Sequence, residues 1–207
     1  MIITYFGKQF FKIQKGDLVV AFNPISKDSK SANKATRFGA MMALSTTNHP
    51  DYNGFEMVSH GETVPFEVKS PGDYEVKDIF IKGIMTDTSI EDKKYINTIY
   101  TLTIENISLC FLGAMNQAKL NADIRGQIGN PDILFVPVND KILNPSDAYK
   151  LAVSLEPKII IPMDYDDKTL KAFLKEGGQE KVSSIDKLTI KVKELAGREG
   201  EIVVLSD

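Results

Sequence analysis

The chain is poor in the residues that most often build metal and redox sites. Among its 207 residues are two histidines, His49 and His60, a single cysteine and no tryptophan. One cysteine excludes an intramolecular disulfide and a zinc site built from several thiolates. Cys110 lies in the apolar run 109–112 without a cationic neighbour in sequence, so we expect a buried, unreactive thiol rather than a nucleophile.

Long apolar runs and a strong charge imbalance are also missing. The longest apolar stretches, such as 134–138 and 159–163, contain proline and are too short to span a bilayer. Residues 1–7 run directly into Lys8, unlike a secretory signal. The net charge of -3 argues against a nucleic acid or an anionic membrane as partner. We therefore expect a cytoplasmic protein with neither kind of partner.

Two enzyme classes lack their sequence motifs here. No serine stands in a Gly-x-Ser-x-Gly elbow, which excludes the common serine hydrolases with that motif. No glycine-rich phosphate loop followed by Lys-Ser or Lys-Thr is present, which argues against a P-loop nucleotide site. With 43% hydrophobic and 26% charged residues, the composition is that of a globular protein, and we expect one domain over residues 1–207.

The first half of the chain predicts β-structure. Residues 2–22 alternate in polarity and break at Gly7-Lys8 and 15–17, a pattern typical of three short antiparallel strands. Further strands are predicted at 41–44, 56–58, 64–68, 74–76 and 79–85, followed by a hairpin of 97–104 and 107–112. The polar residues 26–33 favour a mobile surface loop over a lid that closes on a site.

The second half alternates between strands and helices. Strands are predicted at 133–138, 158–163, 188–192 and 202–205, and helices at 116–125, 144–155 and 166–176. Pro145 suits the first turn of its helix, and Gly177-Gly178 ends the last one. Continuous apolar strands that alternate with helices indicate sheets covered by helices on one face.

One short turn, 47–52, has the residue types of a metal site. His49 and Asp51 stand two residues apart and can face the same side, and an imidazole with a carboxylate suits Zn²⁺. Structural zinc needs four ligands and catalytic zinc usually three plus water, so partners must come from elsewhere. The alternative is structural: Asp51 binds backbone N–H groups of the turn while His49 stacks against its neighbours.

The order of motifs along the chain resembles the metallo-β-lactamase superfamily, and within it the ascorbate-phosphate-lactonase-like, metal-dependent hydrolases. The segments that carry this resemblance are Ile3–Gly7, Asn23-Pro24, Ser70–Val76, Ile81–Ile84, Asn97–Tyr100, Leu109–Gly113, Asp132–Pro137 and Leu155–Met163. The resemblance implies an α/β (α+β) fold, a four-layer αβ/βα sandwich of two mixed β-sheets flanked by helices. It also implies a dinuclear metal site where loops converge at one edge.

The resemblance places the turn 47–52 on the family's His-x-His-x-Asp-His metal loop, with two of its four ligands missing. The first histidine position is Thr47 and the last is Tyr52, so only His49 and Asp51 remain. Hydroxyl groups bind metals poorly at neutral pH because they must first lose a proton, and the reference pKa of tyrosine is ~10.

Other implied ligand positions are replaced as well. The bridging aspartate of the family is Ala114, and a terminal histidine is Asp164. Asn23 stands for an acidic residue and Phe111 for a histidine. Two metal ions ~3.5–4 Å apart need a bridging oxygen ligand and enough donors to offset their repulsion. Alanine cannot supply that ligand, so the dinuclear hydroxide of the family is not expected.

Three hypotheses follow. The favoured one is a non-catalytic ligand-binding or interaction module without a metal cofactor, whose cleft is lined by Thr47, Tyr52 and Ala114. The second is a hydrolase with a single Zn, Mn or Fe ion on His49, Asp51 and Asp164. The third is metal-free acid–base chemistry by these three residues and Tyr52, with Asp51 as the candidate catalytic residue. The partner, a small molecule or a protein, is not identified by the sequence, and a homo-oligomer stays open.

Overall fold

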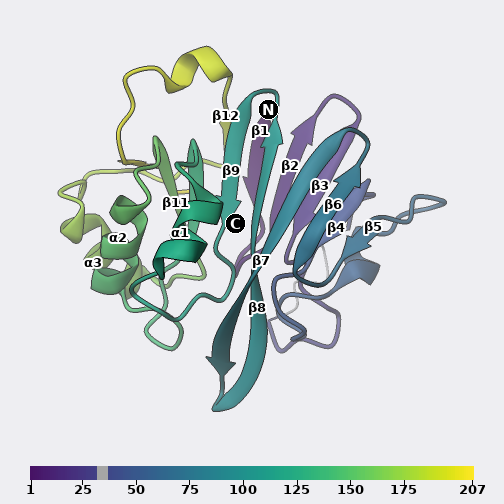
Figure 1. Ribbon diagram of the computed structural model, residues 1–207, viewed down its shortest axis with the longest axis horizontal. Helices are drawn as coiled ribbons and strands as arrows, with labels where there is room; N and C mark the ends of the chain where they lie inside the picture. Colours follow the sequence, from purple (N-terminus) through teal and green to yellow (C-terminus); the bar gives the residue numbers. More distant parts are fainter. Residues whose placement is uncertain (32–36) are drawn as a thin grey trace.

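The computed structural model describes residues 1–31 and 37–207, and two β-sheets packed face to face form its centre (Figure 1). Of the predicted surface loop 26–33, residues 32 and 33 lie outside the described residues. Both sheets are mixed, and the first one pairs residues 2–4 with residues 187–189, near the other end of the chain. This is the two-sheet sandwich that the sequence predicts.

The first sheet has six strands in the order β12-β1-β2-β3-β4-β5. Its pairings are antiparallel from β12 to β3 and parallel from β3 to β5. The three predicted N-terminal strands are confirmed, and alternate residues such as Ile3 and Ile13 are buried. The strands are β1 (Ile2–Tyr5), β2 (Phe11–Lys15), β3 (Leu18–Phe22), β4 (Met42–Leu44), β5 (Phe66–Val68) and β12 (Lys187–Thr189).

The second sheet has seven strands in the order β13-β11-β10-β9-β8-β7-β6. It is parallel from β13 to β9 and antiparallel from β9 to β6. The parallel strands β10 and β11 are buried along their whole length, as expected where both faces are covered. The strands are β6 (Gly72–Val76), β7 (Ile79–Ile90), β8 (Lys93–Ile104), β9 (Ile107–Phe111), β10 (Ile133–Pro137), β11 (Ile159–Met163) and β13 (Glu201–Ile202).

Aromatic side chains fill the space between the sheets. Phe22 of the first sheet stacks on Phe111 of the second with ring centroids 4.6 Å apart, and Phe11 meets Phe135 edge-on at 4.9 Å. All four are fully buried. Burial of one such side chain stabilises the fold by roughly 1.5–3 kcal/mol. Phe111, which the resemblance sets at a histidine position, therefore belongs to the core.

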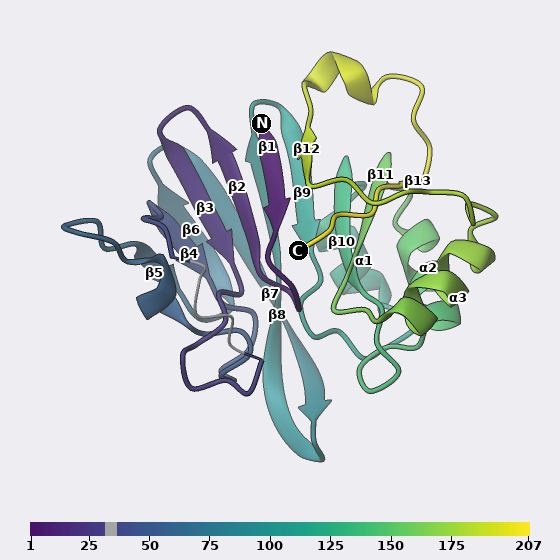
Figure 2. The ribbon, with the colours of Figure 1, turned by 180° about the vertical axis from the view of Figure 1, so that it is seen from behind.

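Three α-helices cover the outer face of the second sheet: α1 (Ala122–Ile128), α2 (Pro145–Ser154) and α3 (Asp167–Glu176) (Figure 2). Their apolar faces, including Leu151 and Phe173, share a second core with Leu134 and Val136 of β10. Asparagine and aspartate side chains cap α2 and α3, as Asn144 accepts the backbone N–H of Asp147.

The outer face of the first sheet is covered in another way. The rings of Phe6, Phe10 and Phe38 pack against one another beside Ala21 and Ala43, with centroids 5.1–5.7 Å apart. The short 3-10 helix η1 (Phe55–Val58) lies in the same layer. Over the described residues, the α-helices of the sandwich thus flank the second sheet.

Some predicted boundaries were wrong. Residues 56–58, predicted as a strand, form η1, and the helix predicted at 116–125 begins only after its cap Asn121. Strands β7 and β8 run through the polar segment 86–94 to a tight turn at Glu91 and Asp92, both with positive φ. The buried residues of β7 in this segment are Thr86 and Thr88, whose hydroxyls donate to backbone carbonyls. A strand whose buried face consists of threonines has no apolar alternation, so its sequence resembles that of a loop.

The loops that follow β4, β9 and β11 contain the predicted site residues and lie at one edge of the sandwich. The β7–β8 hairpin projects past that edge (Figure 1). Loops at the carboxyl ends of strands are common places for binding groups because a rigid sheet positions them. Among the described residues, no helix has the length and apolar character needed to cross a membrane.

Asp132 ties together the starts of three parallel strands. Its carboxylate accepts hydrogen bonds from the Ser108 backbone N–H at 2.8 Å, the Ser108 hydroxyl at 2.9 Å and Lys158 Nζ at 2.7 Å. Burial alone would raise the pKa of Asp132, but these donors outweigh it and hold that pKa below the usual value. The ionised form is therefore stabilised by folding.

We expect Asp132→Asn to lower the free energy of unfolding at pH 7 by about 1–3 kcal/mol, the range for a hydrogen-bonded charged group. Because folding lowers the pKa of Asp132, this contribution is fully present above the unfolded value and disappears as the pH falls through the folded value. Urea unfolding of both proteins at pH 7 and pH 3 checks this. Asp140→Asn, at an exposed ion pair, is the control, and a gap that is equally large at pH 3 would contradict the prediction.

Candidate functional site

The fold brings together the residues that the sequence singled out. Thr47, His49, Asp51 and Tyr52 follow β4, Ala114 follows β9, and Asp164 follows β11. The Tyr52 hydroxyl donates to Asp164 Oδ2 at 3.4 Å, which joins the loop of one sheet to the loop of the other. The residues that the sequence singled out therefore lie at one edge of the sandwich.

A buried amide, Asn97 on β8, organises one half of this edge. Its Oδ1 accepts the backbone N–H of Ala114 at 2.8 Å and the hydroxyl of Thr47 at 3.3 Å. Its Nδ2 donates to Thr86 Oγ1 at 2.9 Å and to the Leu112 carbonyl at 3.0 Å. An amide side chain has two N–H donors and an oxygen that can accept two hydrogen bonds. These four protein contacts therefore use the whole hydrogen-bonding capacity of the Asn97 side chain.

Gly113 allows this close packing. Its φ of 64° lies in the left-handed region, and a Cβ at this position would stand 2.6 Å from Thr46 Cβ. Asn23 holds the other side of Thr46: it accepts the Thr46 backbone N–H at 2.8 Å and donates to Thr46 Oγ1 at 2.9 Å and to Gln9 Oε1 at 3.0 Å. The implied ligand positions Asn23, Thr47 and Ala114 thus hydrogen-bond to other protein groups.

Two carboxylates and an ammonium group form the other half. Lys8 Nζ lies 3.8 Å from Asp51 Oδ2 and 3.5 Å from Asp164 Oδ1. Asp51 also accepts a hydrogen bond from the Ser29 hydroxyl. The side chain of Asp164 is only 3% exposed and that of Lys8 is 34% exposed, so the cluster lies at the border of protein and solvent.

Asp164 is held by several groups at once. Asn139 Nδ2 donates to its carbonyl at 3.0 Å and to Oδ1 at 3.3 Å, and its backbone N–H donates to the Lys8 carbonyl at 2.6 Å. Burial raises the pKa of Asp164, the positive charge of Lys8 opposes that rise, and the nearby Asp51 adds to it. Its backbone φ of 56° is a further sign that this position is fixed by its surroundings.

Tyr52 is a protonated hydrogen-bond donor at neutral pH. Burial first, and then the negative charges of Asp164 and Asp51, hold its pKa well above the usual value. A phenol that keeps its proton donates to a carboxylate and is a poor metal ligand.

The packing of the His49 ring matches one part of the structural alternative for the turn 47–52, but the Asp51 carboxylate bonds to the Ser29 hydroxyl and not to N–H groups of the turn. His49 Nδ1 accepts the backbone N–H of Asp51 at 3.2 Å, and the backbone N–H of His49 donates to the Thr47 carbonyl at 2.8 Å. The imidazole stands 5.7 Å, centroid to centroid, from the rings of both Tyr52 and Tyr95. The second histidine, His60, lies in a separate turn closed by backbone hydrogen bonds with Thr63.

These residues do not fit a pair of metal ions. Ala114 has no donor, the Thr47 hydroxyl is bound to Asn97, and Tyr52 keeps its proton. An ammonium group stands between the remaining carboxylates. Over residues 1–31 and 37–207, no three histidine, cysteine, aspartate or glutamate side chains gather into a potential metal-binding group. The mononuclear set His49, Asp51 and Asp164 stays a prediction that requires Lys8 to move.

Sequence reasoning missed Lys8, Asn97 and Asn139 as members of this site. In the sequence, Asn97 is part of a strand motif and Lys8 marks a break between two strands. A lysine in a turn and an amide in a strand carry no spacing signal, because their partners lie on distant segments. Only the pairing of the sheets makes them neighbours.

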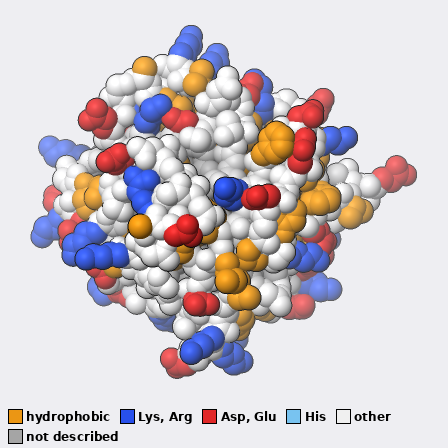
Figure 3. All heavy atoms as spheres, viewed as in Figure 1, with side chains coloured by type: hydrophobic (Ala, Val, Ile, Leu, Met, Phe, Trp, Pro, Cys, Tyr) orange, Lys and Arg blue, Asp and Glu red, His pale blue; other side chains and the backbone are white. Residues whose placement is uncertain are grey.

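A cavity of about 250 Å³ opens at this edge. Its lining mixes charges of both signs with hydroxyl groups: Lys8, Asp28, Ser29, Lys30, Ser31, His49, Pro50, Asp51 and Glu91. Acidic and basic side chains are also interspersed over the face of the molecule in Figure 3. The cavity is therefore suited to a small polar ligand that has both donors and acceptors.

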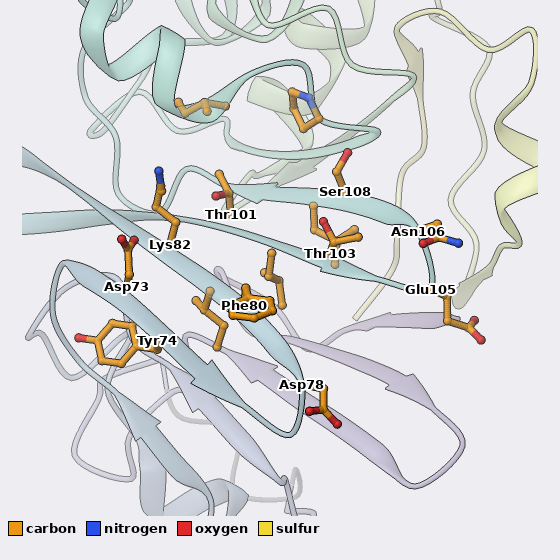
Figure 4. A pocket seen from close by; sticks show the side chains of 15 residues that line it. Asp73, Tyr74, Asp78, Phe80, Lys82, Thr101, Thr103, Glu105, Asn106 and Ser108 are labelled. Carbon is orange, nitrogen blue, oxygen red and sulfur yellow. The ribbon is translucent and has the colours of Figure 1, made fainter.

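A second hollow, of about 680 Å³, lies at the opposite end of β7 and β8 (Figure 4). Phe80, 69% exposed, stands near its middle, with Asp73 and Lys82 toward one end and Glu105 toward the other. Its side chains lie across an open sheet face and do not converge on a point. Among its lining residues, no acid, base and nucleophile are arranged around one point. The better candidate site is therefore the edge that holds residues 47–52, Ala114 and Asp164, called the metal edge below because the resemblance sets the family's metal site there.

Comparison with known proteins agrees with this fold. The family described as a β-lactamase superfamily domain matches residues 2–164. The chain belongs to this superfamily. Residues 47–52, Ala114 and Asp164 all fall within the matched range.

Solved structures of the metallo-β-lactamase fold are similar over nearly the whole chain. A protein of Thermotoga maritima described as a Zn-dependent hydrolase of that superfamily is 25% identical, with a TM-score of 0.77 over 99% of this chain and 97% of its own. One from Parabacteroides distasonis described as a metal-dependent hydrolase is 17% identical, with a TM-score of 0.67 over 99% and 93%. An isothiocyanate hydrolase from Delia radicum gut bacteria is 13% identical, with a TM-score of 0.62 over 93% and 100%. No curated protein matches the chain.

We expect Asn97→Ala to destabilise this β-lactamase superfamily protein by about 1–3 kcal/mol, because the buried Ala114 N–H and the Leu112 carbonyl lose their partner. Asn130→Ala, at an exposed asparagine, should change stability by less than about 0.5 kcal/mol. Chemical denaturation of the three proteins measures both differences. Equal stability of Asn97→Ala and the parent would show that the network does not hold the edge together.

Proposed function

We propose that this protein is a non-catalytic member of the β-lactamase superfamily, and that the cavity at its former metal edge binds a small polar molecule. One observation supports the proposal above all: the positions that hold metal ligands in the family are bound to other protein groups. The Thr47 hydroxyl and the Ala114 backbone N–H donate to Asn97 Oδ1, and the Tyr52 hydroxyl donates to Asp164 Oδ2.

The positions that the resemblance implies to be replaced lie in four separate segments of the chain, at Asn23, 47–52, 111–114 and Asp164. A single lost ligand could be compensated by a neighbour, whereas the dinuclear site here lacks a bridging ligand and most of its imidazoles. The fold persists because its stability comes from the two cores and not from metal. Function lies in the site rather than in the fold, so relatives described as hydrolases do not by themselves make this chain one.

The cavity supports the binding half of the proposal. It is lined by Lys8, Lys30 and His49 as donors and by Asp51 and Glu91 as acceptors, together with serine hydroxyls. A ligand with a carboxylate and an ammonium group would meet a partner for each. An apolar ligand would leave these charged groups unpaired, which costs free energy.

A mononuclear hydrolase is the alternative function. Asp51 and Asp164 already converge on one cation, Lys8 Nζ, so a divalent ion in its place would find two carboxylates. His49 would have to contribute Nε2, because Nδ1 accepts the Asp51 N–H. Zn²⁺, Mn²⁺ and Fe²⁺ are the ions such a ligand set would hold.

Metal analysis of protein purified without a histidine tag separates the two functions. We expect a metal content far below one equivalent, and no rise in melting temperature on addition of Zn²⁺, Mn²⁺ or Fe²⁺, because a ligand stabilises only a fold that binds it. Hydrolysis of lactone, ester and phosphodiester substrates should stay at the level of the buffer. Metal near one equivalent together with stabilisation lost in His49→Ala would establish the alternative instead.

Ligand binding is tested separately. Backbone amide signals of His49 and Asp51 should shift when small zwitterionic or anionic compounds are titrated, while signals around Phe80 stay in place. A matched set of uncharged compounds is the control. If neither set moves the signals of the metal edge, the cavity is not a ligand site.

The remaining expectations of the sequence stand as proposals. We propose one domain over residues 1–207, supported by the pairing of β12 with β1 and of β13 with β11. From the sequence we also propose a cytoplasmic location without nucleic-acid or membrane partners. The sequence does not decide between a monomer and a homo-oligomer.

A further inference from the structure

We propose that the ammonium group of Lys8 takes the place of the metal ions of this superfamily, as the cation that holds Asp51 and Asp164 together and keeps divalent ions out. The proposal rests on the non-catalytic function proposed above, because a chain that loads metal has no use for a second cation at the same carboxylates.

The two carboxylates come from opposite sheets. Asp51 follows β4 of the first sheet and Asp164 follows β11 of the second, and Lys8 Nζ is within 4 Å of both. Without a cation, two carboxylates directed at one point repel each other, and the repulsion acts across the seam between the sheets. The lysine thus provides, from a third segment, the attraction that a shared metal ion provides in a metalloenzyme.

The backbone of Lys8 is fixed to the same residue that its side chain pairs with. The Lys8 carbonyl accepts the Asp164 N–H at 2.6 Å and the Tyr5 hydroxyl at 2.8 Å, and Lys8 has a positive φ of 54°. A non-glycine residue in that region is held there by its surroundings. The ammonium group is consequently tethered at the carboxylates and does not depend on a free ion from solution.

The remaining carboxylate oxygens have their own partners. Asp51 Oδ1 accepts from the Ser29 hydroxyl and Asp164 Oδ2 accepts from the Tyr52 hydroxyl, while Asn139 Nδ2 donates to Asp164 Oδ1, the oxygen that also pairs with Lys8. A lysine and these neutral donors therefore satisfy both acids without metal. A divalent ion would have to displace the ammonium group or lie beside it, and the repulsion between the two cations opposes its binding.

The test is a gain of metal binding when the tethered charge is removed. Lys8→Met keeps the unbranched side chain as far as its ε carbon and removes the ammonium group, and the 34% exposure of Lys8 allows the change without a closed internal void. Isothermal titration of metal-free full-length protein with Mn²⁺ and Zn²⁺ should show binding that is about tenfold tighter or more in Lys8→Met than in the parent. Asp51→Asn in the Lys8→Met background should remove the gain.

Lys30→Met is the matched control, because Lys30 lines the same cavity. An equal gain in that variant would mean that bulk charge, and not the position of Lys8, excludes metal, which overturns the proposal. No gain in Lys8→Met also overturns it, while a metal-free, inactive parent would leave the proposed function intact. A parent that binds metal and hydrolyses substrate overturns the proposed function whatever Lys8→Met does.

A folding failure of Lys8→Met is covered by two further measurements. If the variant folds only when Mn²⁺ is present, the ion has replaced the lysine, which supports the proposal. If it fails to fold in either condition, Lys8→Gln, which keeps a hydrogen-bond donor without the charge, is titrated in its place. A folded Lys8→Gln with the metal affinity of the parent overturns the proposal.

Discussion

The stacked phenylalanines between the two sheets are the contact on which the rest of this molecule depends. Each sheet has one apolar face that must be buried, and Phe22 on Phe111 closes the two faces against each other. This packing fixes the relative position of the strands whose carboxyl ends carry the site. Residues from both sheets, such as Tyr52 and Asp164, can then meet within hydrogen-bonding distance at the shared edge.

In the function that we propose, hydrogen bonds and an ion pair stabilise this edge in place of metal ions. In a dinuclear site, dications hold anionic and imidazole ligands together across the sheets. Here the same positions are joined by the Asn97 amide on one side and by the Lys8 ammonium group on the other. The loops keep their places, and what changes is the chemistry that the edge can perform. The loss of ligands therefore does not require a loss of fold.

The predictions from sequence succeeded where a signal is local. The alternation of residues 2–22, the proline at the start of α2 and the uninterrupted apolar runs of β10 and β11 correctly placed those elements. They failed at η1 and in the far half of the β7–β8 hairpin, where threonines are buried by partners distant in the chain. At the site, the turn 47–52 was found because its ligand pattern is contiguous, whereas Lys8 and Asn97 gave no such pattern.

The family fold and the chemical groups that are absent from the metal edge can both be read from the residues alone, because missing side chains stay missing in any conformation. Ala114 cannot bridge two ions wherever it lies. Only the tertiary structure decided what fills the vacated positions, because those contacts join segments from different sheets. The ammonium of Lys8 meets Asp51 and Asp164 only after the sheets pack, and its position depends on that packing and not on any local pattern.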